Sequence, residues 1–172
     1  MNRKTRRKGR PMKRRIMNPF AMLCFGLAIG AAARLLDIFT TNGGEIFSQM
    51  AVWILMGTLI SIYSKTAKHA MGNVLAFCLG MLVTYYFVAA LSHGVYSMGF
   101  VIGWTVFALC SPVMAYFAWL TKERGIFAKI VRVGIVAVSI LSSILLFDRL
   151  RIYDFLIDGT LLYFLFFKKV NR

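Results

Sequence analysis

Charged side chains are scarce in this sequence, and acidic ones are the scarcest. Of the 172 residues only 16% are Asp, Glu, Lys or Arg, just six are acidic, and 59% are hydrophobic. With a mean hydropathy of +0.71, this composition lies outside the range of soluble domains and is typical of a chain whose solvent is lipid. A sizeable soluble domain is therefore excluded. Because a membrane-spanning helix needs roughly 20 mostly apolar residues, the chain has room for about six spans.

The motifs of common enzyme classes are missing as well. The sequence has no glycine-rich phosphate loop, no paired-histidine metal motif, and no Ser or Cys nucleophile with a plausible base. Cys24, Cys78 and Cys110 lack the spacing and neighbouring histidines of a zinc site and form no disulfide framework, so we expect them to be small apolar packing residues. No internal repeat of the kind found in many secondary transporters is visible. We predict no catalytic residue, metal site or cofactor. An enzyme is therefore the least supported class of protein, and the one kind of enzyme still compatible with the sequence acts on a lipid without a nucleophilic side chain.

Long apolar runs predict a single all-α, polytopic membrane domain over residues 16–168. Six transmembrane helices are expected, at residues 16–37, 46–64, 70–91, 96–120, 127–147 and 152–167. Their short connections favour a compact bundle in which successive helices are antiparallel neighbours. The first run also resembles a secretory signal peptide, with Ala31, Ala32 and Ala33 similar to a cleavage site. Because the apolar character resumes after Arg34, we expect this helix to be retained.

The basic residues indicate which end of the bundle faces the cytoplasm. Residues 1–15 are read as a basic, disordered cytoplasmic tail and residues 169–172 as a basic cytoplasmic end. Short cytoplasmic loops collect Lys and Arg, so both termini are predicted inside. The further basic residues on that side are Lys65, Lys68, Lys122, Arg124, Lys129, Arg132, Lys168, Lys169 and Arg172. Because the tail adjoins a span, its predicted partner is anionic lipid and not nucleic acid.

Acidic residues gather at the opposite, outer side. With Glu123 as the exception, they are predicted near the outer surface, together with Arg34, Arg149 and Arg151; the outer acidic residues are Asp37, Glu45, Asp148, Asp154 and Asp158. Arg151, Asp154 and Asp158 fall on one stripe of the last helix, and Arg34 and Asp37 share a face of the first. An ionisable group within the hydrocarbon costs at least about 2.5–3.5 kcal/mol unless paired or hydrated. Asp158 therefore needs a partner, and Arg34 is predicted at a comparable depth.

Two interpretations of this cluster stand. In the first, Arg34, Asp37, Arg151, Asp154 and Asp158 line an outward-facing polar pocket between the first and sixth helices, and the protein binds a small solute or takes part in transport. In the second, the same residues form ion pairs that only fix helix order, and the protein is a non-catalytic membrane assembly, immunity or stress factor. A small-molecule ligand and a membrane protein partner are both compatible with the sequence.

Small and polar residues within the spans predict helix contacts. Gly26 with Gly30, and Gly99 with Gly103, have the spacing that lets membrane helices approach closely. Pro112 removes a backbone hydrogen bond and predicts a kink that is either architecture or a hinge. Five polar residues within the spans are expected to make hydrogen bonds between helices: Asn73, Thr84, Ser139, Ser142 and Ser143.

Two stretches carry a resemblance to known proteins. WILMGTLISIYSK at residues 53–65 and FCLGMLVTYY at residues 77–86 resemble segments of an uncharacterised family of small six-helix membrane proteins of Gram-positive bacteria. That resemblance implies a bacterial plasma membrane location and nothing about mechanism. The architecture, with six helices and both ends inside, is similar to that of the substrate-binding subunits of energy-coupling-factor transporters. It would imply a separate coupling subunit and ATPases.

Overall fold

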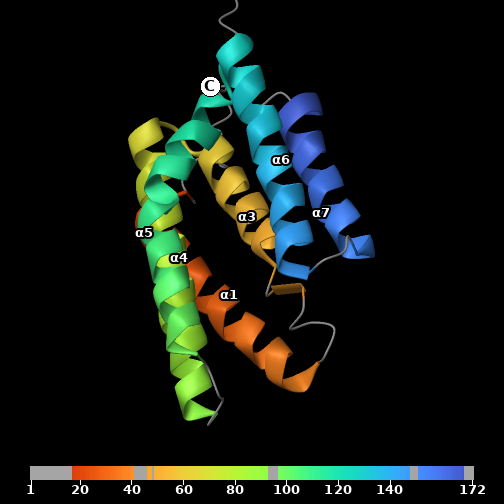
Figure 1. Cartoon of the computed structure of the whole chain (residues 1–172). Helices are drawn as coiled ribbons and strands as arrows, with labels where there is room; N and C mark the ends of the chain where they lie inside the picture. The colour runs from red at the N-terminus through yellow and green to blue at the C-terminus, as the bar shows by residue number, and fades with distance from the viewer. Residues whose placement is uncertain (1–16, 41–45, 48, 93–96, 148–150, 169–172) are drawn as a thin grey trace, which may run out of the picture.

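The computed structural model describes residues 17–40, 46–47, 49–92, 97–147 and 151–168, and over these residues the chain is all-α. Its main elements are α1 (Pro19–Phe39), α3 (Met50–Tyr63), α4 (Ala67–Leu91), α5 (Met98–Leu120), α6 (Ile126–Phe147), α7 (Ile152–Leu162) and a closing π-helical turn, η2 (Tyr163–Phe167) (Figure 1). Each predicted span thus corresponds to a helix, with α7 and η2 forming the last. The predicted N-terminal tail, and the predictions on Glu45, Asp148, Arg149, Lys169 and Arg172, lie outside the described residues.

Local sequence signals set the helix boundaries. Pro19 begins α1, where its missing N–H would have no intrahelical partner. The Thr66 side chain caps α4 by accepting a hydrogen bond from the backbone N–H of His69 at 3.2 Å. Between α5 and α6, Gly125 has a φ of 156°, a conformation that favours glycine. These signals keep two of the connections short, as the sequence predicts.

Four helices are long and apolar enough to cross a membrane: α1, α4, α5 and α6. The remaining two are shorter. α3 has 14 residues, so at 1.5 Å per residue it is about 21 Å long, against a hydrocarbon core of about 30 Å. The described helices are therefore compatible with a multi-pass membrane protein.

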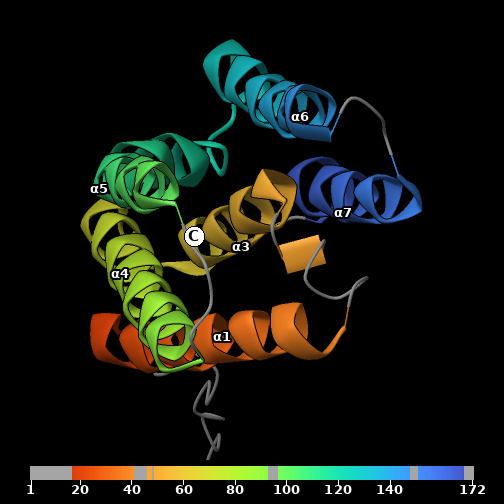
Figure 2. The same ribbon diagram turned by 60° about the horizontal axis from the view of Figure 1, so that its bottom comes forward.

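A short helix, α3, occupies the centre of the bundle. α3 packs against α4, α5, α6 and α7, and the view along the bundle shows these helices arranged around it (Figure 2). Trp53 of α3 is buried, contacts Phe77 of α4 and Trp104 of α5, and donates a hydrogen bond to the Phe47 carbonyl. Its central position explains why α3 is predominantly hydrophobic although it is short.

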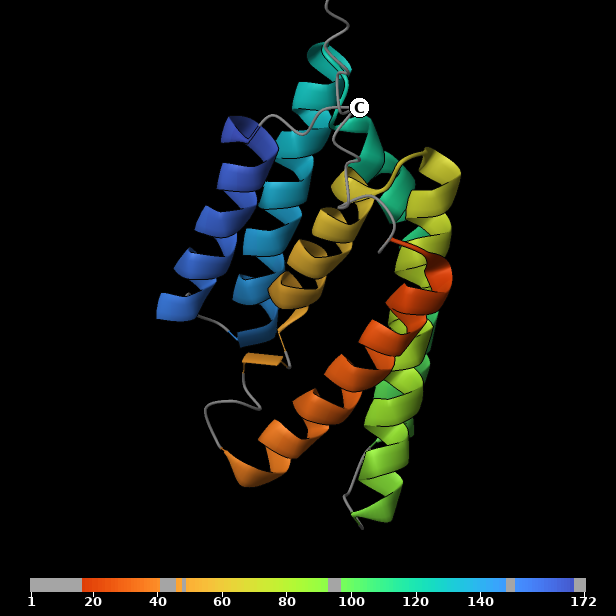
Figure 3. The same cartoon turned by 180° about the vertical axis from the view of Figure 1, so that it is seen from behind.

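The expectation that successive helices are neighbours holds from α3 to α7 but is wrong for the first helix. The main partner of α1 is α4, not α3. Figure 3 shows α1 beginning against α4 and diverging from it toward its end. Glycines allow α1 and α4 to pack this closely. A Cβ built on Gly80 of α4 would lie 2.6 Å from the Leu23 carbonyl oxygen of α1. A Cβ on Gly26 or Gly30 of α1 would overlap the backbone of α4. The predicted close contact at Gly26 and Gly30 is thus confirmed and lies within the bundle. Gly103 has no neighbour within 4 Å of its Cβ position, so the second glycine pair makes no such contact among the described residues.

The helices alternate in direction, so basic connections gather at one end. The α3–α4 and α5–α6 connections and the end of η2 lie toward the top of Figure 1. We call this the basic end; its described basic residues are Lys65, Lys68, Lys122, Arg124, Lys129, Arg132 and Lys168. Glu123 is the one acidic residue described there.

Candidate functional site

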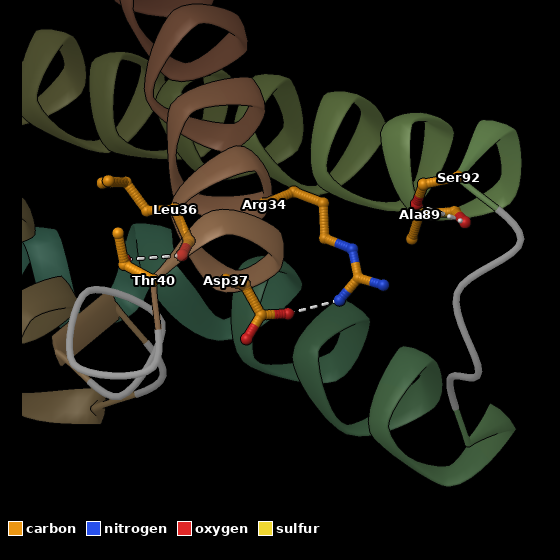
Figure 4. A network of polar contacts seen from close by, with 6 residues as sticks. All are labelled: Arg34, Leu36, Asp37, Thr40, Ala89 and Ser92. Atoms are coloured by element: carbon orange, nitrogen blue, oxygen red, sulfur yellow. Dashed lines mark hydrogen bonds and ion pairs between the residues drawn. The ribbon is translucent and has the colours of Figure 1, made fainter.

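The five predicted site residues fall into two groups on different helices. In the first group, Arg34 and Asp37 form an ion pair one turn apart near the end of α1, between Nη1 and Oδ2 (Figure 4). The Arg34 guanidinium also lies over the ring of Tyr85 on α4, 5.6 Å from its centroid. The group therefore joins α1 to α4 near the end of the bundle opposite the basic end.

In the second group, Asp154 and Asp158 face α6. Asp154 is fully buried; it accepts hydrogen bonds from the Arg151 backbone N–H at 2.7 Å, as part of the α7 capping box, and from the Ser143 hydroxyl at 3.3 Å. Asp158, 7% exposed, accepts a hydrogen bond from the Ser139 hydroxyl at 2.6 Å. A ladder of two carboxylates and two serines thus holds α7 on α6.

The structure does not bring the two groups together. Arg34 pairs with Asp37 on its own helix, whereas the hydrogen-bond partner of Asp158 is Ser139, so the predicted pairing of Asp158 with Arg34 is corrected. The physical reason is helix order: α1 packs on α4, while α7 packs on α3 and α6. A ligand-binding role for these five residues remains a prediction.

Polar residues within the spans make most of the predicted contacts between helices. Asn73 donates to the Ser64 hydroxyl at 2.9 Å, and Thr84 donates to the Leu27 carbonyl at 2.8 Å. Ser139 and Ser143 reach α7 as described above. Ser142 is the exception, because its hydroxyl donates to the Ser139 carbonyl of its own helix at 2.7 Å. Of the three cysteines Cys78 is buried, but Cys24 and Cys110 are exposed on the bundle surface and do not pack inside it.

An apolar groove, which the sequence did not indicate, lies between α5 and α6. It has a volume of about 360 Å³, its floor is made by α3 and α4, and its walls are made by α5 and α6. Its lining residues are Trp53, Ile54, Gly57, Thr58, Val74, Cys78, Phe107, Ser111, Met114, Ala115, Phe117, Ala118, Ile130, Val131, Gly134, Ile135 and Val138. We call it the α5–α6 groove. A cavity of this size with walls of this kind suits an apolar molecule.

Pro112 lies beside this groove, within the continuous helix α5. Proline has no N–H to donate to the carbonyl four residues earlier, that of Ala108. The Ser111 hydroxyl donates to this carbonyl at 2.7 Å instead, so the freed backbone acceptor is satisfied. Ser111 is 3% exposed and lines the groove. The Ser-Pro pair thus keeps the groove wall intact in an apolar setting.

Thr58 places a hydroxyl group among the mostly apolar residues that line the groove. Its side chain is 4% exposed and lines the groove on the α3 side. Within the described part of the chain its hydroxyl has no hydrogen-bond partner. The hydroxyl can therefore donate a hydrogen bond to a molecule in the groove.

The basic end is fixed by cations that bind the backbone. The Lys122 ammonium donates to the Ser64 carbonyl at 2.6 Å, and the Arg132 Nε donates to the Thr121 carbonyl at 3.0 Å. The pKa of Lys168, beyond the last helix, is raised mainly by a hydrogen bond with the Tyr63 side chain. These contacts tie the ends of α3, α5, α6 and η2 to one another at the basic end.

Comparison of the chain with known proteins finds no matching family model, no similar curated protein and no similar solved structure. The two resemblances noted in the sequence therefore remain predictions. Among the described residues no group of three or more His, Cys, Asp or Glu side chains is arranged to hold a metal ion. Function has to be inferred from the side chains and the groove themselves.

Proposed function

We propose that this chain is a six-span membrane protein with both ends in the cytoplasm, and that it binds an apolar, chain-shaped molecule of the bilayer in the α5–α6 groove. The observation that carries the proposal is the groove itself, a space of about 360 Å³ walled by four helices and lined almost wholly by apolar side chains. In a bilayer such a space is adjacent to lipid tails, which match its chemistry.

Six spans and an inward basic end are supported by the packing. α3 is short, but the helices around it replace lipid as its surroundings, and α7 with η2 runs from Ile152 to Phe167, a length of about 24 Å. The basic residues at one end agree with the excess of Lys and Arg in cytoplasmic loops. On the resemblance of residues 53–65 and 77–86 noted above, the membrane proposed is a bacterial plasma membrane.

For the charged cluster, the contacts favour the structural interpretation. Arg34 and Asp37 pair with each other beside Tyr85, and Asp154 and Asp158 accept hydrogen bonds from α6 serines. We therefore assign these residues to helix packing and place ligand binding in the groove.

A glycine pair on the bundle surface gives a matched test. A Cβ at Gly134, on the groove wall, meets nothing within 4 Å, and the same holds for Gly159 on α7, outside the groove. Gly134→Leu fills part of the groove, whereas Gly159→Leu adds the same atoms elsewhere. Native mass spectrometry of the purified full chain should detect a retained lipid-like mass in the wild type and Gly159→Leu that is largely lost in Gly134→Leu. Equal retention by both variants, or an empty wild type after gentle extraction, would rule the groove out as the binding site.

A further inference from the structure

The α5–α6 groove ends at the basic end. Phe117 and Ala118, in the last turn of α5, and Ile130, early in α6, line it, and these helix ends are joined by the turn at residues 121–125. A molecule lying along the groove therefore has one end next to this turn. In the proposed topology that end is at the cytoplasmic surface.

Some of the basic side chains near this turn make contacts within the bundle, and others are exposed without such contacts among the described residues. The ammonium of Lys122 and the guanidinium of Arg132 donate to backbone carbonyls. Arg124, in the turn, and Lys129, in the first turn of α6, are exposed and make no side-chain hydrogen bond or ion pair with the described residues. The first N–H groups of α6 also point out of the helix here, with the positive end of its dipole. The apolar groove is therefore continuous with a surface that favours an anion.

Thr58 adds a donor between these two environments. It stands six residues before Ser64, the C-cap of α3, and so lies about 9 Å from the basic end along the helix. The interfacial region of a bilayer is roughly 5–7 Å thick on each side of the hydrocarbon. With the end of α3 at Ser64 placed at the outer edge of the interface, Thr58 lies close to the depth at which glycerol ester carbonyls, which only accept hydrogen bonds, meet the acyl chains.

We infer that the occupant of the α5–α6 groove is a phospholipid of the cytoplasmic leaflet with a net negative headgroup. One acyl chain lies in the groove, an ester carbonyl accepts a hydrogen bond from Thr58, and the phosphate lies against Arg124 and the start of α6. This inference rests on the proposed function, because it names the class of molecule that the groove takes.

The test compares two lipids on one protein. The full chain is purified in detergent, delipidated, and given equal amounts of phosphatidylglycerol and phosphatidylcholine, and native mass spectrometry counts the copies of each that remain bound. The wild type should retain phosphatidylglycerol preferentially. Arg124→Gln with Lys129→Gln should lower that preference by about fivefold to thirtyfold, as expected for one or two basic contacts to an anionic headgroup, while phosphatidylcholine binding is unchanged.

A second double variant controls for charge alone. Lys65→Gln with Lys68→Gln removes the same charge from exposed residues of the same end, at the α3–α4 connection, and should leave the preference within about twofold of the wild type, because its charges are not at the groove mouth. If both double variants lower the preference equally, or if the wild type shows none, the headgroup inference is wrong even though the groove binds lipid. If Gly134→Leu retains both lipids as the wild type does, the proposed function fails instead.

Discussion

The close packing of α4 against α1 at Gly80 gives the sharpest stability prediction. Gly80→Ala places a methyl group 2.6 Å from the Leu23 carbonyl oxygen and 3.0 Å from the Leu27 nitrogen. Ordinary van der Waals contact for a Cβ begins at 3.4 Å, so α1 and α4 must separate locally by about 0.8 Å. Both obstructing atoms are backbone, and neither can move without its helix.

The separation has a second consequence at Thr84, one turn further along α4. Its hydroxyl donates to the Leu27 carbonyl at 2.8 Å; if the shift acts along this bond, the distance rises to about 3.6 Å, beyond hydrogen-bond range. Overpacking costs about 1–3 kcal/mol, and a hydrogen bond between membrane helices about 0.6 kcal/mol. We expect Gly80→Ala to lower the free energy of unfolding by about 2–4 kcal/mol relative to its control.

That control is Gly103→Ala on α5, where the added methyl group meets nothing within 4 Å. It gains the same helix propensity as Gly80→Ala, so that contribution cancels in the comparison. Reversible unfolding by SDS in mixed micelles measures both variants, and adding Thr84→Val to each tests the mechanism. Thr84→Val should cost less in the Gly80→Ala background than alone. If the two glycine variants differ by less than about 0.5 kcal/mol, the close α1–α4 packing described above is incorrect.

Three further predictions concern the α6–α7 ladder, the groove and the topology. Ser139→Ala removes the hydrogen bond to the buried Asp158 carboxylate and should cost about 1–3 kcal/mol in the same unfolding assay, whereas Ser142→Ala, which loses only a bond within α6, should cost less than 0.5 kcal/mol. Thr58→Val keeps the side-chain shape but removes the free donor, so it should weaken lipid retention in native mass spectrometry without lowering the unfolding free energy; unchanged retention would contradict the assigned role of this hydroxyl. In a cysteine-free background, Ser97→Cys should react with an impermeant thiol reagent from outside intact cells and Lys65→Cys should not. Labelling of Lys65→Cys from outside would reverse the proposed topology.

Much of the architecture could be predicted because it depends on properties that are local in sequence. Apolar runs and their boundaries, such as Pro19 or the glycine at Gly125, determine where each helix begins and ends. The spacing of Gly26 and Gly30 predicted a close contact, which the structure confirms. The same spacing at Gly99 and Gly103 makes no close contact among the described residues, because a small-residue stripe permits approach but does not supply a partner.

The site could not be predicted because it depends on which helices are neighbours. Periodicity places Asp158 at a depth and on a face of its helix, but it does not say which helix that face meets. Arg34 was the plausible partner on depth alone, and Ser139, an uncharged residue on the preceding helix, is the observed one. The groove is harder still, since its lining comes from four helices and consists of residues that are unremarkable in any single apolar run.

The two ends of the bundle differ in how far their charged side chains are paired within the protein, and this difference bears on function. Away from the basic end, the described carboxylates are matched by partners on the protein itself: Asp37 by Arg34, Asp154 by the α7 N-terminus and Ser143, and Asp158 by Ser139. At the basic end, seven described basic residues stand against one acidic residue, and Arg124 and Lys129 keep their charges exposed. Charged groups that are already paired within the protein have little capacity left to bind a ligand. Exposed cations next to an apolar groove, in contrast, favour a molecule with an anionic headgroup and an apolar chain. A search for a ligand should accordingly begin with lipids, at the end of the groove nearest the basic end, before small polar solutes at the opposite end of the bundle.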